Sequence, residues 1–439
     1  MTPDTDANRK DATLRARSDR QLIRSTHRSE RFVLVELQAP PAPERAGRDP
    51  GNLAFVLDRS GSMSGAKIGL AKRAIETAVE RLLPSDRFAI VCYDDRVDLV
   101  VESTSASREA KQNAVERLRS IDARGSTDLA SGWLRGAEQV AAALATSGSD
   151  AGSVNRVLLL TDGLANVGMT DPAELTRHAT ELRSRGVTTT TFGVGEDFDE
   201  SLLQAMAQAG GGHFYFIADA VQIADHIATE VGELLSVVAR DVALEVTAAD
   251  GLDVRTLSPY PMDVRGNRRL VLLGDVMAEQ ALEVVLRIRF PYGPIDTEVG
   301  ILVGAVDREG ALLAAGATPV GVGWRYADDP ANDAQSRDRS VDRVVARLFA
   351  ARARQEAGKL NRLGDFREAV AELREVGRKI AGYAGNDPEL GRIVAELKAE
   401  EGRWAAPAPE MARKVAFAAS SYLMQSRSPE GRARRGGGA

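Results

Sequence analysis

The chain has 439 residues, of which 44% are hydrophobic and 27% are charged, proportions that are ordinary for a globular protein. Lys and Arg number 57 against 63 Asp and Glu, and the resulting net charge of −6 gives no general attraction to nucleic acid or to an anionic membrane. A single cysteine, Cys92, excludes disulfides within the chain, and the four histidines are scattered without metal-ligand spacing.

Residues 1–30 are polar and charged, without the apolar central stretch of a secretory signal, and we expect them to be disordered or frayed. Residues 31–50 hold a β-like run, 32–39, followed by a linker rich in Pro and Arg. No run approaches the ~20 apolar residues that span a bilayer, so we expect a soluble, cytoplasmic protein. A chain of 439 residues exceeds what one hydrophobic core usually serves, and we expect two or three domains.

From residue 51 to 237, apolar runs alternate with amphipathic patterns, which predicts a doubly wound α/β domain with a mostly parallel sheet. The run 53–57 predicts a buried central strand, and 97–101 predicts an antiparallel edge strand. Because connections between parallel strands are right-handed, we expect the loops after the strands to lie at one edge of the sheet. The other predicted elements are strands 87–93, 154–161, 187–194 and 213–217, and helices 67–83, 107–120, 128–145, 199–209, 220–235 and one that opens at 171.

After residue 237 apolar and polar residues alternate, which predicts a β-sandwich over 238–327 with the run 32–39 as an extra strand. The α/β domain is then inserted into the sandwich. Residues 328–430 open with a polar linker and continue as a helical bundle, while the tail 431–439 is expected to be disordered. A tetratricopeptide-like hairpin around 363–369 is an alternative that the sequence leaves open. The predicted strands are 242–247, 269–273, 282–290, 298–306 and 321–326, and the predicted helices are 341–359, 366–381, 388–403 and 410–425.

Three loops of the α/β domain carry oxygen-bearing side chains where predicted elements end. Asp58, Ser60 and Ser62 follow the strand 53–57 in the pattern D-x-S-x-S, Thr127 lies between two predicted helices, and Asp162 follows the strand 154–161. Carboxylate and hydroxyl oxygens are hard ligands that suit Mg²⁺, Ca²⁺ or Mn²⁺. The first pattern alone is also typical of a turn or a helix N-cap, but the three loops together favour a metal site.

Together these residues resemble the metal-ion-dependent adhesion site (MIDAS) of the von Willebrand factor A domain family, in a protein of bacterial multidomain type. The resemblance covers about residues 50–235 and implies that a divalent cation, expected to be Mg²⁺ with Ca²⁺ or Mn²⁺ as alternatives, is held by Asp58, Ser60, Ser62, Thr127 and Asp162. Five protein positions leave room on an ion that takes about six oxygen ligands. In the family, an Asp or Glu of a partner protein commonly takes that place.

Residues beside the predicted ligands have two possible roles. Asp94, Asp95 and Asp128 are nearby acids that could orient the ligands or serve an adjacent site. Gly61 and Gly125 are expected to let the loops bend close to the ion, although ordinary turn glycines would look the same.

The expected function is therefore a metal-dependent protein–protein interaction module without catalytic activity. The segment 64–67 matches S-x-x-K of serine β-lactamases but lacks its partner motifs, and neither a phosphate loop nor a dinucleotide fingerprint is present. The alternative is a recruiting or cofactor subunit of an AAA+ ATPase of the magnesium chelatase or MoxR-like type, because similar A domains serve such machines. The insertion resembles the integrin β arrangement, so we also expect the helix 220–235 to shift when the bound ligand changes.

Overall fold

The computed structural model describes residues 12–42, 49–147, 153–310, 312–313 and 317–436. The chain forms two compact units, one of which is Glu44–Val237. The other combines Met1–Pro43 with Val238–Ala439, so the first unit interrupts the second in sequence. This is the insertion that the sequence predicts.

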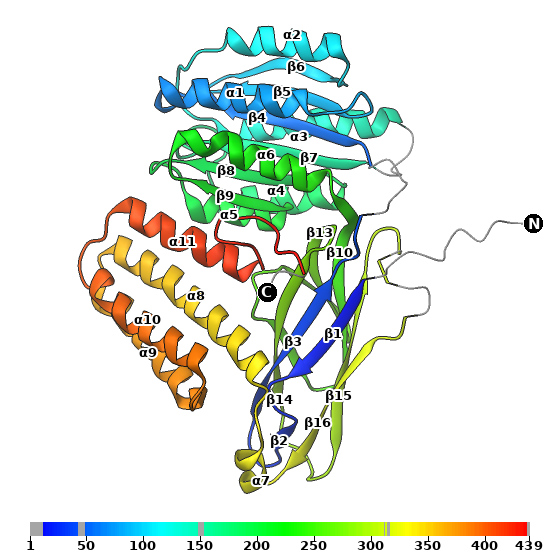
Figure 1. Cartoon of the computed structure of the whole chain (residues 1–439), viewed down its shortest axis with the longest axis vertical. Coiled ribbons are helices and arrows are strands. Elements are labelled where there is room, and N and C mark those ends of the chain that lie inside the picture. Colours follow the sequence, from blue (N-terminus) through cyan, green and yellow to red (C-terminus); the bar gives the residue numbers. More distant parts are fainter. Residues whose placement is uncertain (1–11, 43–48, 148–152, 311, 314–316, 437–439) are drawn as a thin grey trace, which may run out of the picture. The chain divides into compact units, whose positions relative to one another are not determined.

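The inserted unit is built on a six-stranded sheet with the order β6-β5-β4-β7-β8-β9 (Figure 1). All neighbouring strands are parallel except β6, which pairs antiparallel with β5 as the predicted edge strand. Strand order reverses between β4 and β7, and ligands of doubly wound sheets bind where the order reverses. The strands are β4 (Gly51–Asp58), β5 (Arg87–Tyr93), β6 (Val97–Ser105), β7 (Val154–Thr161), β8 (Thr188–Val194) and β9 (Gly211–Ile217).

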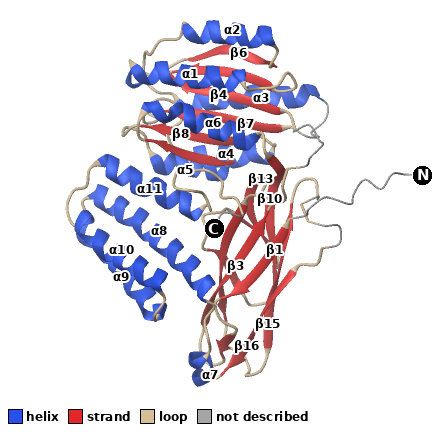
Figure 2. Cartoon of the chain, in the orientation of Figure 1, coloured by secondary structure: helices blue, strands red, loops and turns tan. Residues whose placement is uncertain are grey.

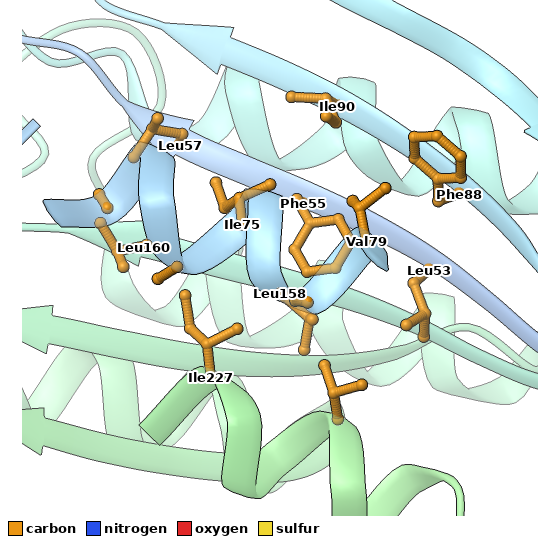
Figure 3. Packing of buried hydrophobic residues seen from close by; sticks show 14 of the residues in the cluster. Leu53, Phe55, Leu57, Ile75, Val79, Phe88, Ile90, Leu158, Leu160 and Ile227 are labelled. Carbon is orange, nitrogen blue, oxygen red and sulfur yellow. The ribbon is translucent and has the colours of Figure 1, made fainter. Parts of the chain in front are cut away.

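Helices cover both faces of this sheet. Alternate residues of β4 point to opposite faces, and Leu53, Phe55 and Leu57 share one buried core with α1, α2 and α6, as Figure 3 shows for α1 and α6. Helix α3 contacts β4, β5 and β7. Because β4 and β7 are buried along their whole length, their ends are held firmly. The helices are α1 (Ala66–Glu80), α2 (Arg108–Arg119), α3 (Leu129–Ser147), α4 (Pro172–Ser184), α5 (Glu200–Ala209) and α6 (Ile223–Leu234), with the short 3₁₀ turns η1 (Gly61–Met63) and η2 (Ala220–Gln222).

The second unit contains two sheets that share a core. A four-stranded sheet has the order β1-β3-β14-β11, and a six-stranded sheet has the order β12-β13-β10-β15-β16-β2. Val35 and Val284 of the first sheet belong to the same buried cluster as Val246 and Val303 of the second. The strands are β1 (Thr13–Ser18), β2 (Leu22–Arg24), β3 (Ser29–Gln38), β10 (Val237–Ala248), β11 (Asp253–Thr256), β12 (Met262–Arg265), β13 (Arg268–Met277), β14 (Ala281–Phe290), β15 (Glu298–Val306) and β16 (Val320–Ala327).

Helices complete the second unit, and Figure 2 shows α8 to α11 grouped together. They enclose a core of their own that includes Leu373, Ile380 and Trp404. A further buried cluster joins α8 to the four-stranded sheet through Val345 and Leu34. The helices are α7 (Asp329–Ala334), α8 (Arg339–Leu363), α9 (Phe366–Ala384), α10 (Pro388–Trp404) and α11 (Glu410–Met424).

Three segments that the sequence predicts to be frayed, a linker or disordered contain ordered structure. Strands β1 and β2 lie within the segment 1–30 that we expected to be frayed, whose first eleven residues are outside the described part. Helix α7 lies within the expected polar linker. In the tail, Ala281 N donates to Arg434 O at 2.8 Å and Gly436 N donates to Glu279 O at 2.9 Å, so residues up to 436 pair with the sheet instead of being disordered. Residues 437–439 lie outside the described part.

Among the described residues, no helix combines the length and the apolar character needed to cross a bilayer.

Candidate metal site at the edge of the inserted sheet

Asp58 is the last residue of β4 and is completely buried. Its Oδ1 accepts a hydrogen bond from Ser60 N at 2.8 Å, and its Oδ2 accepts one from Thr161 Oγ1 at 2.6 Å. Burial raises the pKa of Asp58 to about 6 because it disfavours the charged carboxylate, and the hydrogen bonds from Thr161 and Ser60 only partly offset this. A buried carboxylate of this kind gains stability from a cation placed beside it.

Asp162 and two serine hydroxyls lie next to one another. Ser60 Oγ is 3.0 Å from Ser62 Oγ, and Ser62 Oγ donates to Asp162 Oδ1 at 2.6 Å. Asp162 is completely buried and directly follows β7. Leu57 of β4 is in register with Leu160 of β7, so the residues that follow these strands meet at the same edge of the sheet.

Thr127 reaches the same place from the loop between α2 and α3. Its backbone N donates to Asn166 Oδ1 at 3.0 Å, and its backbone O accepts from Asn166 N at 3.3 Å, which ties this loop to the loop after β7. A Cβ added to Gly163 would lie 3.3 Å from Thr127 Oγ1 and 3.7 Å from Ser62 Oγ. The hydroxyls of Thr127 and Ser62 therefore face the same small space, which a larger residue at 163 would fill.

The geometry and the donor types fit a hard divalent cation. All five side chains offer carboxylate or hydroxyl oxygens, which are the ligands that Mg²⁺, Ca²⁺ and Mn²⁺ prefer. Two oxygens on adjacent corners of an octahedron with ~2.1 Å bonds lie about 3.0 Å apart, and the Ser60 and Ser62 hydroxyls have this separation. The structure thus brings together every residue of the set predicted from the sequence: Asp58, Ser60, Ser62, Thr127 and Asp162.

Comparison with known proteins agrees with the fold of the inserted unit. The family model described as von Willebrand factor type A domain matches residues 52–229. Residues 52–229 therefore form a von Willebrand factor type A domain, called the A domain below. A solved structure described as von Willebrand factor type A from Catenulispora acidiphila covers 95% of this chain and 97% of its own, with a TM-score of 0.69 and 19% sequence identity, and has the same fold.

Two relatives are similar in sequence to part of the chain. The uncharacterized protein YfbK of Escherichia coli is 34% identical over 197 residues, which cover 44% of this chain and 33% of that protein. The uncharacterized protein sll0103 of Synechocystis sp. is 28% identical over 283 residues, covering 62% of this chain and 64% of that protein. The chain therefore spans less than two thirds of the length of each of these relatives.

Two of the acids beside the predicted ligands, Asp94 and Asp128, contact other groups of the A domain. Asp94 Oδ2 accepts from Arg124 Nε at 2.5 Å, and its Oδ1 accepts from Arg96 N at 2.8 Å. Asp128 accepts from both the backbone N and the hydroxyl of Ser131, at 3.1 and 2.8 Å, and so caps the start of α3. Through these contacts Asp94 and Asp128 hold the loops of the site in place.

The two loop glycines differ in what the backbone demands of them. Gly125 has a φ of 69°, in the left-handed region that favours glycine, and an added Cβ would lie 2.3 Å from Asp95 Oδ1. Gly61 begins the 3₁₀ turn η1, and its N donates to Gly125 O at 3.1 Å. The two glycines therefore join the first loop of the A domain to the second.

Three further residues of the site were missed from the sequence. Thr161 donates a hydrogen bond to Asp58, and Asn166 accepts one from the backbone N of Thr127. The third residue is Lys67, whose Nζ lies 2.5 Å from Asp162 Oδ2. Thr161 and Asn166 carry no signal beyond their closeness to Asp162 in sequence. Lys67 does carry one, because a cation in the first turn of a helix opposes the helix dipole and needs a compensating anion.

A second group of metal-ligating side chains lies elsewhere in the A domain and comprises His213, Glu230 and Glu233. Glu230 is completely buried on α6, and both of its oxygens accept hydrogen bonds from neighbouring side chains. The ion pair with Arg156 NH1, at 2.6 Å, balances its charge within the protein. We interpret this group as the anchor of α6 on the sheet. The contacts to Glu230 include those from Arg156 and Thr190, both at 2.6 Å, Tyr215 at 2.8 Å and His213 at 3.1 Å.

Proposed function

We propose that this chain is a metal-dependent protein-interaction module whose A domain holds a divalent cation, with Mg²⁺ as the first candidate. The ion would be held by Asp58, Ser60, Ser62, Thr127 and Asp162. When bound, it would supply an attractive position for a carboxylate of a partner protein, because the five side chains do not fill the coordination of an ion that takes about six oxygens. The observation that carries this proposal is the convergence of these side chains from three loops on one small space beside Gly163.

The chain's own residues prepare the site in two ways. The buried positions of Asp58 and Asp162 place negative charge where the surroundings screen it little. The hydrogen bonds from Thr161 to Asp58 and from Ser62 to Asp162 fix the orientation of both carboxylates, so little side-chain freedom is lost when a ligand binds.

We also propose that the site is not catalytic. A hydrolytic metal site needs a general base beside the ion. In the described part of the chain, the side chains that hydrogen-bond to the two aspartates are those of Thr161, Ser60, Ser62 and Lys67, none of which is a histidine or a spare carboxylate. This composition favours binding over hydrolysis.

Affinity capture from native lysate, with the full chain as bait, tests the proposed interaction. Capture in Mg²⁺ is compared with capture in EDTA, and each is repeated with the Asp162→Ala variant. We expect at least one protein that binds only in Mg²⁺ and only to the wild type. Recovery of an AAA+ ATPase by the same criterion would favour the recruiting-subunit function, whereas identical capture in all four conditions would contradict a metal-dependent module.

A further inference from the structure

Lys67 places a positive charge directly on a predicted ligand of the ion. Its Nζ lies 2.5 Å from Asp162 Oδ2, while Asp162 Oδ1 accepts from Ser62. Asp162 is completely buried, whereas the Lys67 side chain is 31% exposed. The ammonium therefore lies at the boundary between the buried carboxylate and solvent.

The position of Lys67 in its helix is electrostatically unfavourable on its own. It is the second residue of α1, whose first turn contains no acidic residue. A cation at a helix N-terminus is disfavoured by the helix dipole, and the contact with Asp162 offsets this unfavourable placement. The N-terminus of α1 and the ammonium both add positive potential at the site.

Charge counting shows what Lys67 changes. Asp58 and Asp162 carry two negative charges, which a bound divalent cation neutralises. The ion, its five predicted ligands and Lys67 together then carry a net charge of +1. Arg59, which lies in the loop after β4, contacts other groups: its NH1 donates to Asp98 at 2.9 Å and its Nε donates to Asp122 O at 2.8 Å. Among the described cations, Lys67 is thus the one that contacts the predicted ligands.

We propose that Lys67 couples the binding of the cation to the binding of an anionic ligand. Its charge repels the divalent ion when no ligand is present, and it attracts a carboxylate once the ion is bound. The inference rests on the proposed function. It adds that Lys67 makes the bound ion prefer a carboxylate of the partner to an uncharged oxygen. Coupling of this kind is reciprocal, so a carboxylate must also tighten the binding of the ion.

Titration calorimetry with Mn²⁺, on full-length protein first treated with EDTA and desalted, tests this coupling. Each titration is made in sodium chloride and in sodium acetate of equal ionic strength. For a unit charge a few ångströms from a dication in water-like surroundings, we expect Lys67→Met to bind Mn²⁺ on the order of ten-fold more tightly than the wild type in chloride. Acetate is expected to tighten Mn²⁺ binding by the wild type and to have less effect on the variant.

Two further variants make the result specific. Arg73→Met removes an exposed cation from the same helix and is expected to match the wild type in both salts. Acetate that complexes free Mn²⁺ affects all variants equally, so comparison with this control corrects for it. Lys67→Arg keeps the charge and is expected to retain the acetate response. Equal or weaker Mn²⁺ binding by Lys67→Met in chloride would overturn the inference alone, whereas a wild type that binds no Mn²⁺ would overturn the proposed function as well.

Discussion

Ser62 Oγ donates a hydrogen bond to Asp162 Oδ1 at 2.6 Å, although 100 residues separate them in the chain. The contact exists because β4 and β7 are adjacent parallel strands, and each predicted acidic ligand stands where one of them ends. The chain leaves β4 toward one side of the sheet and β7 toward the other, which keeps the edge between them open. The proposed metal site is thus a direct product of the sheet order.

Removing the Asp162 carboxylate should greatly weaken metal binding. We expect Asp162→Ala to lower the affinity for Mg²⁺ or Mn²⁺ by on the order of 10–100-fold, because one of two charges is lost and the hydrogen bond that orients Ser62 is lost with it. Titration calorimetry measures the change. Asp197→Ala removes an exposed acid from the loop after β8 at the same edge of the sheet and should leave affinity unchanged. Unchanged affinity in Asp162→Ala would refute the ligand assignment.

Gly163 keeps open the space that the Thr127 and Ser62 hydroxyls face. A methyl group in Gly163→Ala would lie 3.3 Å from Thr127 Oγ1, so we expect several-fold weaker metal binding with little change in the melting temperature. Gly69→Ala on α1, where the nearest atom is the end of the Arg73 side chain at 3.7 Å, should have no effect on affinity. Equal metal binding by the two variants would show that the space beside Gly163 does not hold the ion.

Glu230 should be a major anchor of α6, the helix proposed to respond to the ligand. Glu230→Gln keeps the shape of the side chain but leaves the buried Arg156 without its carboxylate, and we expect a loss of about 3–5 kcal/mol in the free energy of unfolding. Urea denaturation measures this value. Asp225→Asn, an exposed position on the same helix, should change it by less than about 1 kcal/mol. A loss of less than about 1 kcal/mol in Glu230→Gln would show that Glu230 does not anchor α6.

Cys92 should be unreactive until the A domain unfolds. It is completely buried on β5, and burial raises the pKa of its thiol to about 12 by disfavouring the thiolate. A thiol reagent at pH 8 should therefore label no cysteine in the native protein and one per chain in denaturant. Fast labelling of the native protein would contradict the predicted burial.

The same thiol gives a defined pH dependence of stability. The unfolded thiol ionises near its ordinary value of 9.0 while the buried one stays neutral, so the folded state binds more protons than the unfolded state above that pH. The contribution of Cys92 to the free energy of unfolding is constant below about pH 9 and decreases above it. Cys92→Ala should show a smaller decrease between pH 9 and 10, measured by urea denaturation. An identical decrease would exclude Cys92 as its source.

The convergence of the five predicted side chains could be anticipated because the sequence signals are local. The two strands that end at the site, β4 and β7, each contain a continuous apolar run that is followed closely by an acidic residue. Ser60 and Ser62 follow Asp58 at short spacing. Convergence then follows from the parallel sheet. Lys67 could not be assigned in the same way, because its contact with Asp162 depends on where α1 starts relative to β7, which local pattern does not specify.

The second unit was predicted less completely. Strand β1, with the sequence Thr-Leu-Arg-Ala-Arg-Ser, contains no fully buried residue, so its alternation lacks the strong apolar signal of a core strand. The tail around Arg434 is rich in Gly and Arg, and such a composition favours disorder when it is read alone. Its pairing with Ala281 depends on an edge supplied from a distant part of the chain, which the local sequence does not reveal.

Titration of the EDTA-treated, desalted wild-type chain with Mg²⁺ in a calorimeter tests the central claim most directly. The predicted result is one ion bound per chain, with binding abolished or strongly weakened in Asp58→Ala. Absence of saturable binding, or equal binding by the wild type and Asp58→Ala, would contradict the claim that these five side chains hold a divalent ion.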